Sequence, residues 1–119
     1  MEKPNLPHDH HSAMEKDFDH MPAAEAFGVT ADLFKLMSDP TRIRLFWLLC
    51  HCEECVLNLS VMMNMSSPAL SHHLKLRKAC GLIVCRREGK EVYYRASDSA
   101  EAEALHHVIE HVAEIACPD

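Results

Sequence analysis

Six cysteines and ten histidines in 119 residues make this chain rich in ligands for soft and borderline metal ions. Three of the thiols lie close together in the sequence, as Cys50, Cys52 and Cys55. Three thiolates so close together could chelate a thiophilic ion such as zinc, cadmium, lead or arsenite. The same cysteines could instead be core residues, or Cys52 and Cys55 could form a redox pair. The spacing therefore predicts a thiolate metal site and leaves packing and redox chemistry open.

Histidines also gather near the N-terminus, where His8, His10 and His11 lie in a polar stretch that contains prolines. They could form an accessory metal site, or they could be solvated residues of a flexible tail over residues 1–22. This stretch has no apolar core of the kind that a secretion signal needs. We therefore expect a cytoplasmic protein with reduced thiols, one domain over residues 23–119 and no membrane contact.

The net charge of −6 conceals a basic segment. Residues 60–95 carry seven Lys or Arg and two Glu, which gives a local charge of +5, and the segments on either side are acidic. Because phosphate contacts depend on the local electrostatic field, this segment could bind nucleic acid in spite of the overall charge.

The periodicity of the apolar residues predicts mostly helical structure around this segment. Helix start signals occur at Asp39-Pro40 and at Ser66-Ser67-Pro68, and Gly81 is placed to end the second of these helices. Two β-prone runs joined by a glycine turn follow. The expected order is helices over 23–37, 40–50, 56–63 and 68–80, a hairpin of 82–87 and 92–96, and a last helix to about 116 capped by Ser97 or Asp98.

The apolar residues of these helices define the expected core, and the second helix is expected to be almost entirely buried. The residues expected to be buried are Phe27, Leu33, Phe34, Leu36 and Met37 in the first helix, Ile43, Leu45, Phe46, Trp47, Leu48 and Leu49 in the second, and Leu70 and Leu74 in the fourth. Ala104, Leu105, Val108, Val112 and Ile115 form an apolar stripe on the last helix.

A short helix, a turn, a capped helix and a basic hairpin together form a winged helix-turn-helix. In that arrangement the capped helix enters the major groove of DNA with its N-terminal residues against the base edges, and the wing contacts the backbone or the minor groove. The candidate DNA-binding residues are Ser67, Ala69, Ser71, His72 and Lys75 on the helix and Arg86, Arg87 and Lys90 on the wing. His73 could contact DNA or could be a structural histidine, because it precedes Leu74 on the buried side.

Several motifs in this order resemble the ArsR/SmtB family of repressors. The runs that carry the resemblance are Ser38-Asp39-Pro40-Thr41-Arg42-Ile43-Arg44, Ser71-His72-His73-Leu74-Lys75-Leu76, Gly81-Leu82-Ile83 and Arg86-Arg87-Glu88-Gly89-Lys90-Glu91-Val92-Tyr93-Tyr94. The match covers about residues 34–117. It implies a mainly α (α+β) winged helix-turn-helix with four helices, a hairpin wing and a C-terminal dimerisation helix.

The resemblance also implies two places for a metal sensor. One is the third helix, where the family's cysteine pattern aligns with residues 53–59, retaining Cys55 and replacing the second cysteine by Leu57. The other spans the paired last helices, where Asp98, His111 and Glu114 stand at family ligand positions and Ala100 replaces a ligand histidine. His107 lies four residues before His111 on the same helical face and could supply the missing ligand, as could Glu101 or one of His8, His10 and His11. Zinc, nickel or another divalent ion would suit such a set.

These observations predict a homodimeric repressor that binds double-stranded operator DNA and is released when it binds a metal ion, zinc being one candidate. A repressor of the same fold that senses oxidants or persulfide through Cys52 and Cys55 is an alternative. A metal-storage protein without DNA activity is another, but it leaves the basic wing without a purpose. No hydrolase or phosphate-loop motif is present, so we expect neither an enzyme nor an organic substrate.

Overall fold

The computed structural model describes residues 7–8 and 18–117, with the backbone alone at 76–79. The chain divides into two compact units, residues 1–35 and 36–119. Most of the tail predicted over residues 1–22, including His10 and His11, lies outside the described residues.

Helix α2 (Ala24–Leu36) accounts for most of the described part of the first unit, and none of its residues is buried. Phe27 and Phe34 are 50% and 59% exposed, so the prediction that they are buried is wrong for this single chain. Periodicity identifies an apolar side of a helix, but it does not show what covers that side.

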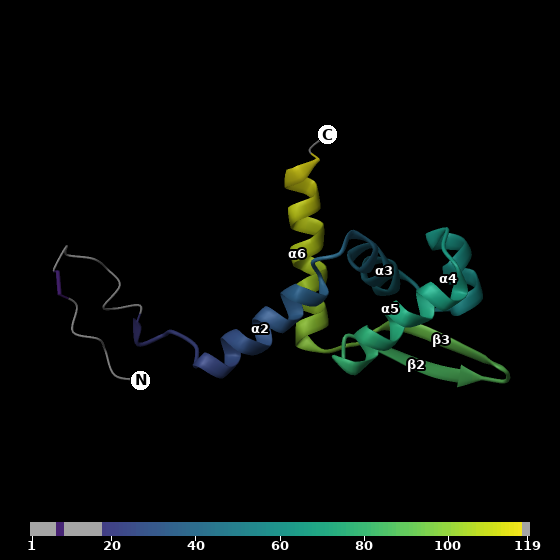
Figure 1. Ribbon diagram of the computed structural model, residues 1–119, viewed down its shortest axis with the longest axis horizontal. Helices are drawn as coiled ribbons and strands as arrows, with labels where there is room; N and C mark the ends of the chain where they lie inside the picture. The colour runs from purple at the N-terminus through teal and green to yellow at the C-terminus, as the bar shows by residue number, and fades with distance from the viewer. Residues whose placement is uncertain (1–6, 9–17, 118–119) are drawn as a thin grey trace. The chain divides into compact units, whose positions relative to one another are not determined.

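The second unit contains the rest of the architecture (Figure 1). Its elements are α3 (Pro40–His51), β1 (Glu54–Cys55), α4 (Val56–Met63), α5 (Ser67–Ala79), β2 (Ile83–Glu88), β3 (Glu91–Ala96) and α6 (Ala100–Ala116). Helices α4 and α5 form the helix-turn-helix, and the β2–β3 hairpin projects away from α6 as the wing. The winged helix-turn-helix that was predicted is therefore confirmed.

Short capping signals begin and end these helices. The Asp39 side chain accepts a hydrogen bond from the Thr41 amide at 3.3 Å, and Pro40 fills the first turn of α3, where a missing N–H is harmless. The Ser66 hydroxyl accepts from the Ala69 amide at 3.3 Å at the start of α5. Gly81 follows α5 with φ of +74°, a conformation that glycine adopts without strain.

The N-cap of α6 differs from the expected one. Ser99 caps the helix by accepting a hydrogen bond from the Ala102 amide at 3.1 Å, whereas Ser97 or Asp98 was predicted. Ser97 instead donates to the Gly81 carbonyl at 2.8 Å and so ties the start of the last helix to the end of α5. Ser97, Asp98 and Ser99 all have side chains that can cap a helix, so the sequence alone could not show which of them does so.

The core is formed where α3, α4 and α5 meet the sheet. Its buried residues are Leu45, Leu49, Leu59, Met63, Leu70, Leu74 and Ile83. The prediction that α3 is almost entirely buried is wrong at Trp47, which is 39% exposed. On α6, Leu105 is buried, but Val108, Val112 and Ile115 are 49–66% exposed, so the predicted stripe is largely uncovered in this single chain.

The sheet has three strands in the order β1-β3-β2, all antiparallel. Strand β1 was not predicted, because a two-residue strand shows no alternation. Its pairing of Glu54 with Tyr94 and Cys55 with Tyr93 joins the end of α3 to the wing. Within the part of the chain that is described, no helix is long and apolar enough to cross a membrane.

Candidate DNA-binding surface and metal-ligand clusters

Helix α5 presents one exposed face next to the hairpin. Leu70 and Leu74 are 0% and 2% exposed and fix the helix on the core. Ala69, His72 and Lys75 are exposed and stand three residues apart, so they share one face of the helix. Of the other candidates, Ser67 and Ser71 are half-buried. The structure thus places a small residue, an imidazole and an ammonium together on the outer side of α5.

His73 lies on the flank of this face. Its side chain is half-buried next to Leu74, and its ring centroid is 6.1 Å from that of His72. This placement is compatible with both functions that the sequence left open for His73.

The arginines of the wing are not equivalent. Arg86 donates from Nε to Glu53 Oε1 at 2.8 Å and from Nη1 to Glu88 Oε2 at 2.7 Å, and its guanidinium lies 4.8 Å from the centre of the Tyr93 ring. The bond to Glu53 raises the pKa of Arg86 above its ordinary value and lowers that of Glu53. Arg87 and Lys90 are exposed near the hairpin turn. Arg86 therefore anchors the wing in the DNA-free protein, while Arg87 and Lys90 point to solvent.

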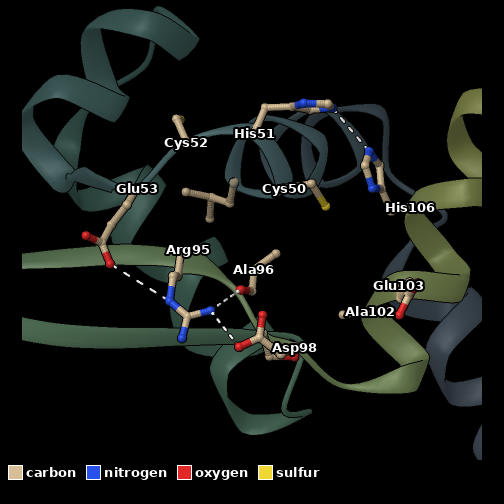
Figure 2. A pocket seen from close by; sticks show the side chains of 12 residues that line it. Cys50, His51, Cys52, Glu53, Arg95, Ala96, Asp98, Ala102, Glu103 and His106 are labelled. Atoms are coloured by element: carbon tan, nitrogen blue, oxygen red, sulfur yellow. Dashed lines mark hydrogen bonds and ion pairs between the residues drawn. The ribbon is translucent and has the colours of Figure 1, made fainter.

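Sequence reasoning missed the function of Glu53, which pairs with Arg95 of the hairpin as well as with Arg86. Its Oε2 lies 3.9 Å from Arg95 Nε, and Arg95 also reaches Asp98 Oδ2 at 3.4 Å (Figure 2). The acidic pair Glu53-Glu54 was visible in the sequence, but its partners are more than 30 residues away and could not be assigned.

The structure does not gather the three cysteines into one ligand cluster. Cys50 lies in α3, Cys52 in the extended residue that follows it, and Cys55 in β1. The Cys52 thiol donates to the Leu48 carbonyl at 3.2 Å. Burial, with a smaller contribution from the charge of Glu110, raises the pKa of Cys50 to about 11. Burial and the charge of Glu54 likewise raise the pKa of Cys52. The thiolate site stays a prediction, and Cys50 and Cys52 are held mainly in their protonated form.

The final-helix set is also dispersed within one chain. Asp98 precedes α6 and pairs with Arg95, and His107 Nε2 lies 3.9 Å from Glu103. His111 and Glu114 are exposed further along α6. Ligands shared between two subunits need not meet in one chain, so this set stays a prediction too.

A different group does converge. Among the residues that the structure describes, one group of three or more His, Cys, Asp or Glu side chains brings its ligand atoms within 4.8 Å of one another, and it consists of His51, His106 and Glu110. Sequence reasoning assigned none of these three residues to a site. The His-x-x-x-Glu spacing on α6 was a visible signal, but its partner on α3 was not.

A cavity of about 470 Å³ adjoins this group (Figure 2). His51 and Cys50 enter it from α3, and His106 and Glu103 enter it from α6. It continues to Glu53, Arg95 and Asp98 at the base of the wing. One cavity of the second unit is therefore lined by two members of the convergent group, His51 and His106, by Cys50 and Cys52, and by Glu53 and Arg95 at the base of the wing.

Comparison with known proteins agrees with this architecture. Residues 39–84 match the family model for bacterial regulatory proteins of the arsR family. A transcriptional repressor SmtB homologue of Synechocystis is 34% identical over 71% of this chain, and the chain spans 64% of that relative's length. A cadmium resistance transcriptional regulatory protein, a CadC homologue of Staphylococcus aureus, is 34% identical over 72% of each chain.

A solved structure extends the comparison to three dimensions. The homodimeric winged helix-turn-helix DNA-binding domain from Mycobacterium bovis superposes with a TM-score of 0.64 at 25% identity, covering 81% of this chain and 90% of that one. Sequence and fold thus lead to the same classification. The chain belongs to the ArsR family of bacterial regulatory proteins, as its motifs predicted.

Proposed function

We propose that this protein is a dimeric transcriptional repressor of the cytoplasm that binds operator DNA through α5 and the hairpin and leaves it when a metal ion binds. The observation that carries the proposal is the outer face of α5. Ala69 lets the helix backbone approach the groove closely, His72 offers ring nitrogens to bases or phosphates, and Lys75 offers a point charge to phosphate. Leu70 and Leu74 hold the opposite side of the helix in the core, so this face has a fixed orientation.

The wing extends the same surface. Arg87 and Lys90 are exposed beside the turn at Gly89, where φ of +63° allows the tight reversal. Their charges would meet the DNA backbone or the minor groove. Arg86 would support the wing through Glu53 rather than serve as a primary contact.

Two uncovered apolar surfaces support a dimer. Val108, Val112 and Ile115 follow one side of α6, and Phe27 and Phe34 are exposed on α2. Apolar groups of this size at helical spacing are typical of surfaces that a partner covers. The similar domain from Mycobacterium bovis is homodimeric. Two copies of α5 held at a fixed spacing would then read two half-sites.

Metal control is supported by the names of the relatives and by the ligand content of the chain. A cadmium resistance regulator and an SmtB homologue are both about one-third identical to it. The thiol-switch alternative is less favoured, because burial and the charge of Glu54 raise the pKa of Cys52, and a protonated thiol is a weak nucleophile. A bound metal that stabilises a dimer unsuited to the operator would weaken DNA binding, with a coupling that is typically about 1–3 kcal/mol.

The experiment is an operator-binding assay. The purified full-length protein selects its site from a random DNA library, and fluorescence anisotropy then measures affinity with and without zinc, nickel, cadmium or arsenite. A selected palindromic site, and weaker binding with at least one of these ions, support the proposal. Failure to select any sequence would overturn the repressor assignment, and an affinity unchanged by every ion would overturn metal control.

A further inference from the structure

The convergent group joins two helices that are distant in sequence. His51 is the last residue of α3, and His106 and Glu110 stand one turn apart on α6, so both side chains of α6 point toward the same end of α3. Figure 2 shows His51 and His106 facing each other across the gap between the helices.

Two of the three separations between the ligand atoms are close to those around a small cation. The two Nε2 atoms of His51 and His106 are 3.1 Å apart, and His51 Nε2 is 3.3 Å from Glu110 Oε1. A tetrahedral ion with bonds of about 2.0–2.2 Å holds its ligand atoms about 3.3–3.6 Å apart. The remaining pair, His106 Nε2 and Glu110 Oε1, is 2.5 Å apart, and these two atoms would have to separate by about 1 Å around an ion.

The three side chains form a hydrogen-bonded network in which the Glu110 carboxylate pairs with both imidazoles. Two Nε2 atoms that face each other can share one proton, and both also face the same carboxylate oxygen. Burial alone would raise the pKa of Glu110, but the hydrogen bonds and charges of His106 and His51 lower it, so the carboxylate is the ionised acceptor of the group. Deprotonation of the two imidazoles would expose their Nε2 lone pairs beside this carboxylate, and a divalent cation would then take the place of the shared protons.

The surroundings pre-organise the ligands and leave access for an ion. The Trp47 ring packs on His51 with centroids 4.3 Å apart, which gives this exposed tryptophan a function and limits rotation of the imidazole. The side chains of His51 and Glu110 are 45% and 51% exposed, and His106 is 26% exposed. Solvent therefore reaches the group directly.

We propose that His51, His106 and Glu110 bind one divalent transition-metal ion per protomer, with a water molecule as the fourth ligand. Two imidazoles and a carboxylate are a donor set suited to zinc, cobalt or nickel, and three protein ligands leave one position open. All three ligands belong to one protomer and none of them is a cysteine, so this site differs from the thiolate site and from the final-helix set that the sequence predicted.

The position of the site also suggests how its occupation would reach DNA, a step that rests on the proposed function. Glu53, two residues after His51, holds Arg86 and Arg95 of the hairpin. An ion that fixes the end of α3 against α6 would fix the segment from which Glu53 reaches the wing. The metal would thereby bias the orientation of the wing relative to α6.

The test compares matched variants of the full-length protein. Glu110→Gln and His106→Asn each remove one proposed ligand, and Glu103→Gln removes an exposed carboxylate from the same helix and the same cavity. Metal-free protein is titrated with cobalt chloride and zinc chloride. The readouts are the visible absorption of four-coordinate cobalt and the zinc affinity, and circular dichroism confirms that each variant is folded.

We expect Glu110→Gln and His106→Asn to weaken zinc binding at least about 10-fold, because even loss of an outer-sphere partner costs about 10–100-fold. Glu103→Gln should bind as the wild type does. Equal affinities in all four proteins would overturn the site. Loss of binding in His107→Asn or Glu114→Gln, with Glu110→Gln unaffected, would overturn it in favour of the final-helix set.

A measurement of operator binding distinguishes a failure of the proposed metal site from a failure of the proposed function. If metal-free Glu110→Gln binds the operator as the wild type does but is no longer released by zinc, this site is the sensor. If zinc still releases Glu110→Gln, the regulatory part is wrong, whatever the cobalt spectrum shows. If the wild type binds no operator, the proposed function fails while the metal titration still decides the site.

Discussion

Arg86 on the wing donates a 2.8 Å hydrogen bond to Glu53, which stands between α3 and β1. The same Glu53 lies 3.9 Å from Arg95 on the neighbouring strand. One carboxylate thus links both strands of the hairpin to the segment that follows α3. Arg86 is exposed and Glu53 and Arg95 are half-buried, so we expect these bonds to position the wing and to add little to the stability of the fold.

Replacing Glu53 should therefore affect the wing selectively. Glu53→Gln removes the charge that holds Arg86 and Arg95, and we expect a small change in melting temperature with higher amide hydrogen exchange in β2 and β3. Glu101→Gln, which removes an exposed carboxylate from the first turn of α6, is the control. Unchanged exchange in the hairpin of Glu53→Gln would show that the carboxylate does not position the wing.

Removing a proposed phosphate contact should weaken binding to all DNA sequences. We expect Lys75→Ala or Arg87→Ala to reduce the slope of log affinity against log salt by about 1, because one fewer counterion is released. Lys75→Arg keeps the charge and should keep most of the slope. Anisotropy titrations at several salt concentrations measure this slope. A slope in the alanine variants equal to that of the wild type would place Lys75 and Arg87 outside the interface.

The core of the helix-turn-helix should depend strongly on Leu70. This side chain is 0% exposed among Leu45, Leu59 and Leu74, and Leu70→Ala should lower the free energy of unfolding by roughly 2–5 kcal/mol through lost burial and a cavity. Leu57, 69% exposed on α4, is the matched control, and its alanine variant should change stability by less than about 0.5 kcal/mol. Urea unfolding of both variants measures this difference. An effect of Leu70→Ala as small as that of Leu57→Ala would contradict the prediction.

Dimerisation should depend on the exposed stripe of α6. Val112→Asp places a charge among Val108 and Ile115, where a partner would have to bury it, and we expect monomers in sedimentation velocity. Val61→Asp introduces the same charge at a 76% exposed site on α4 and should leave the dimer intact. A Val112→Asp protein that sediments like the wild type would exclude this surface as the interface.

Tyr93 should titrate above the ordinary tyrosine value of 10. Its hydroxyl donates to Glu91 Oε2 at 2.7 Å, and this bond, together with the charge of Glu91, raises the pKa of Tyr93. Because the folded-state pKa is raised, the contribution to stability is present below the unfolded pKa and is lost as the pH rises through the folded pKa. The difference in melting temperature between the wild type and Tyr93→Phe should therefore shrink in strong alkali, and a constant difference would contradict this assignment.

The elements were predictable because their signals are local. Asp39-Pro40, Ser66 and Gly81 act through neighbouring residues, and each begins or ends a helix where the sequence placed it. Strand β1 was missed because two residues cannot show a period, and its existence depends on Tyr93 and Tyr94, almost 40 residues away.

Of the candidate sites, too, one could be predicted from local spacing and one could not. The outer face of α5 follows from helical spacing, since residues three apart share a side, and Ala69, His72 and Lys75 are indeed exposed together. The group of His51, His106 and Glu110 depends on which turn of α6 meets the end of α3. That packing is a long-range property, which no local pattern around His51 reveals.

The most direct test of the account is photo-cross-linking to the selected operator. A benzophenone amino acid replaces His72 on α5, Arg87 on the wing or Val61 on α4, and the metal-free protein is irradiated on DNA with and without zinc. We predict cross-links from positions 72 and 87 that fall when zinc is added, and none from position 61. Cross-links from position 61 alone, or none from position 72, would contradict the assignment of α5 as the helix that reads DNA.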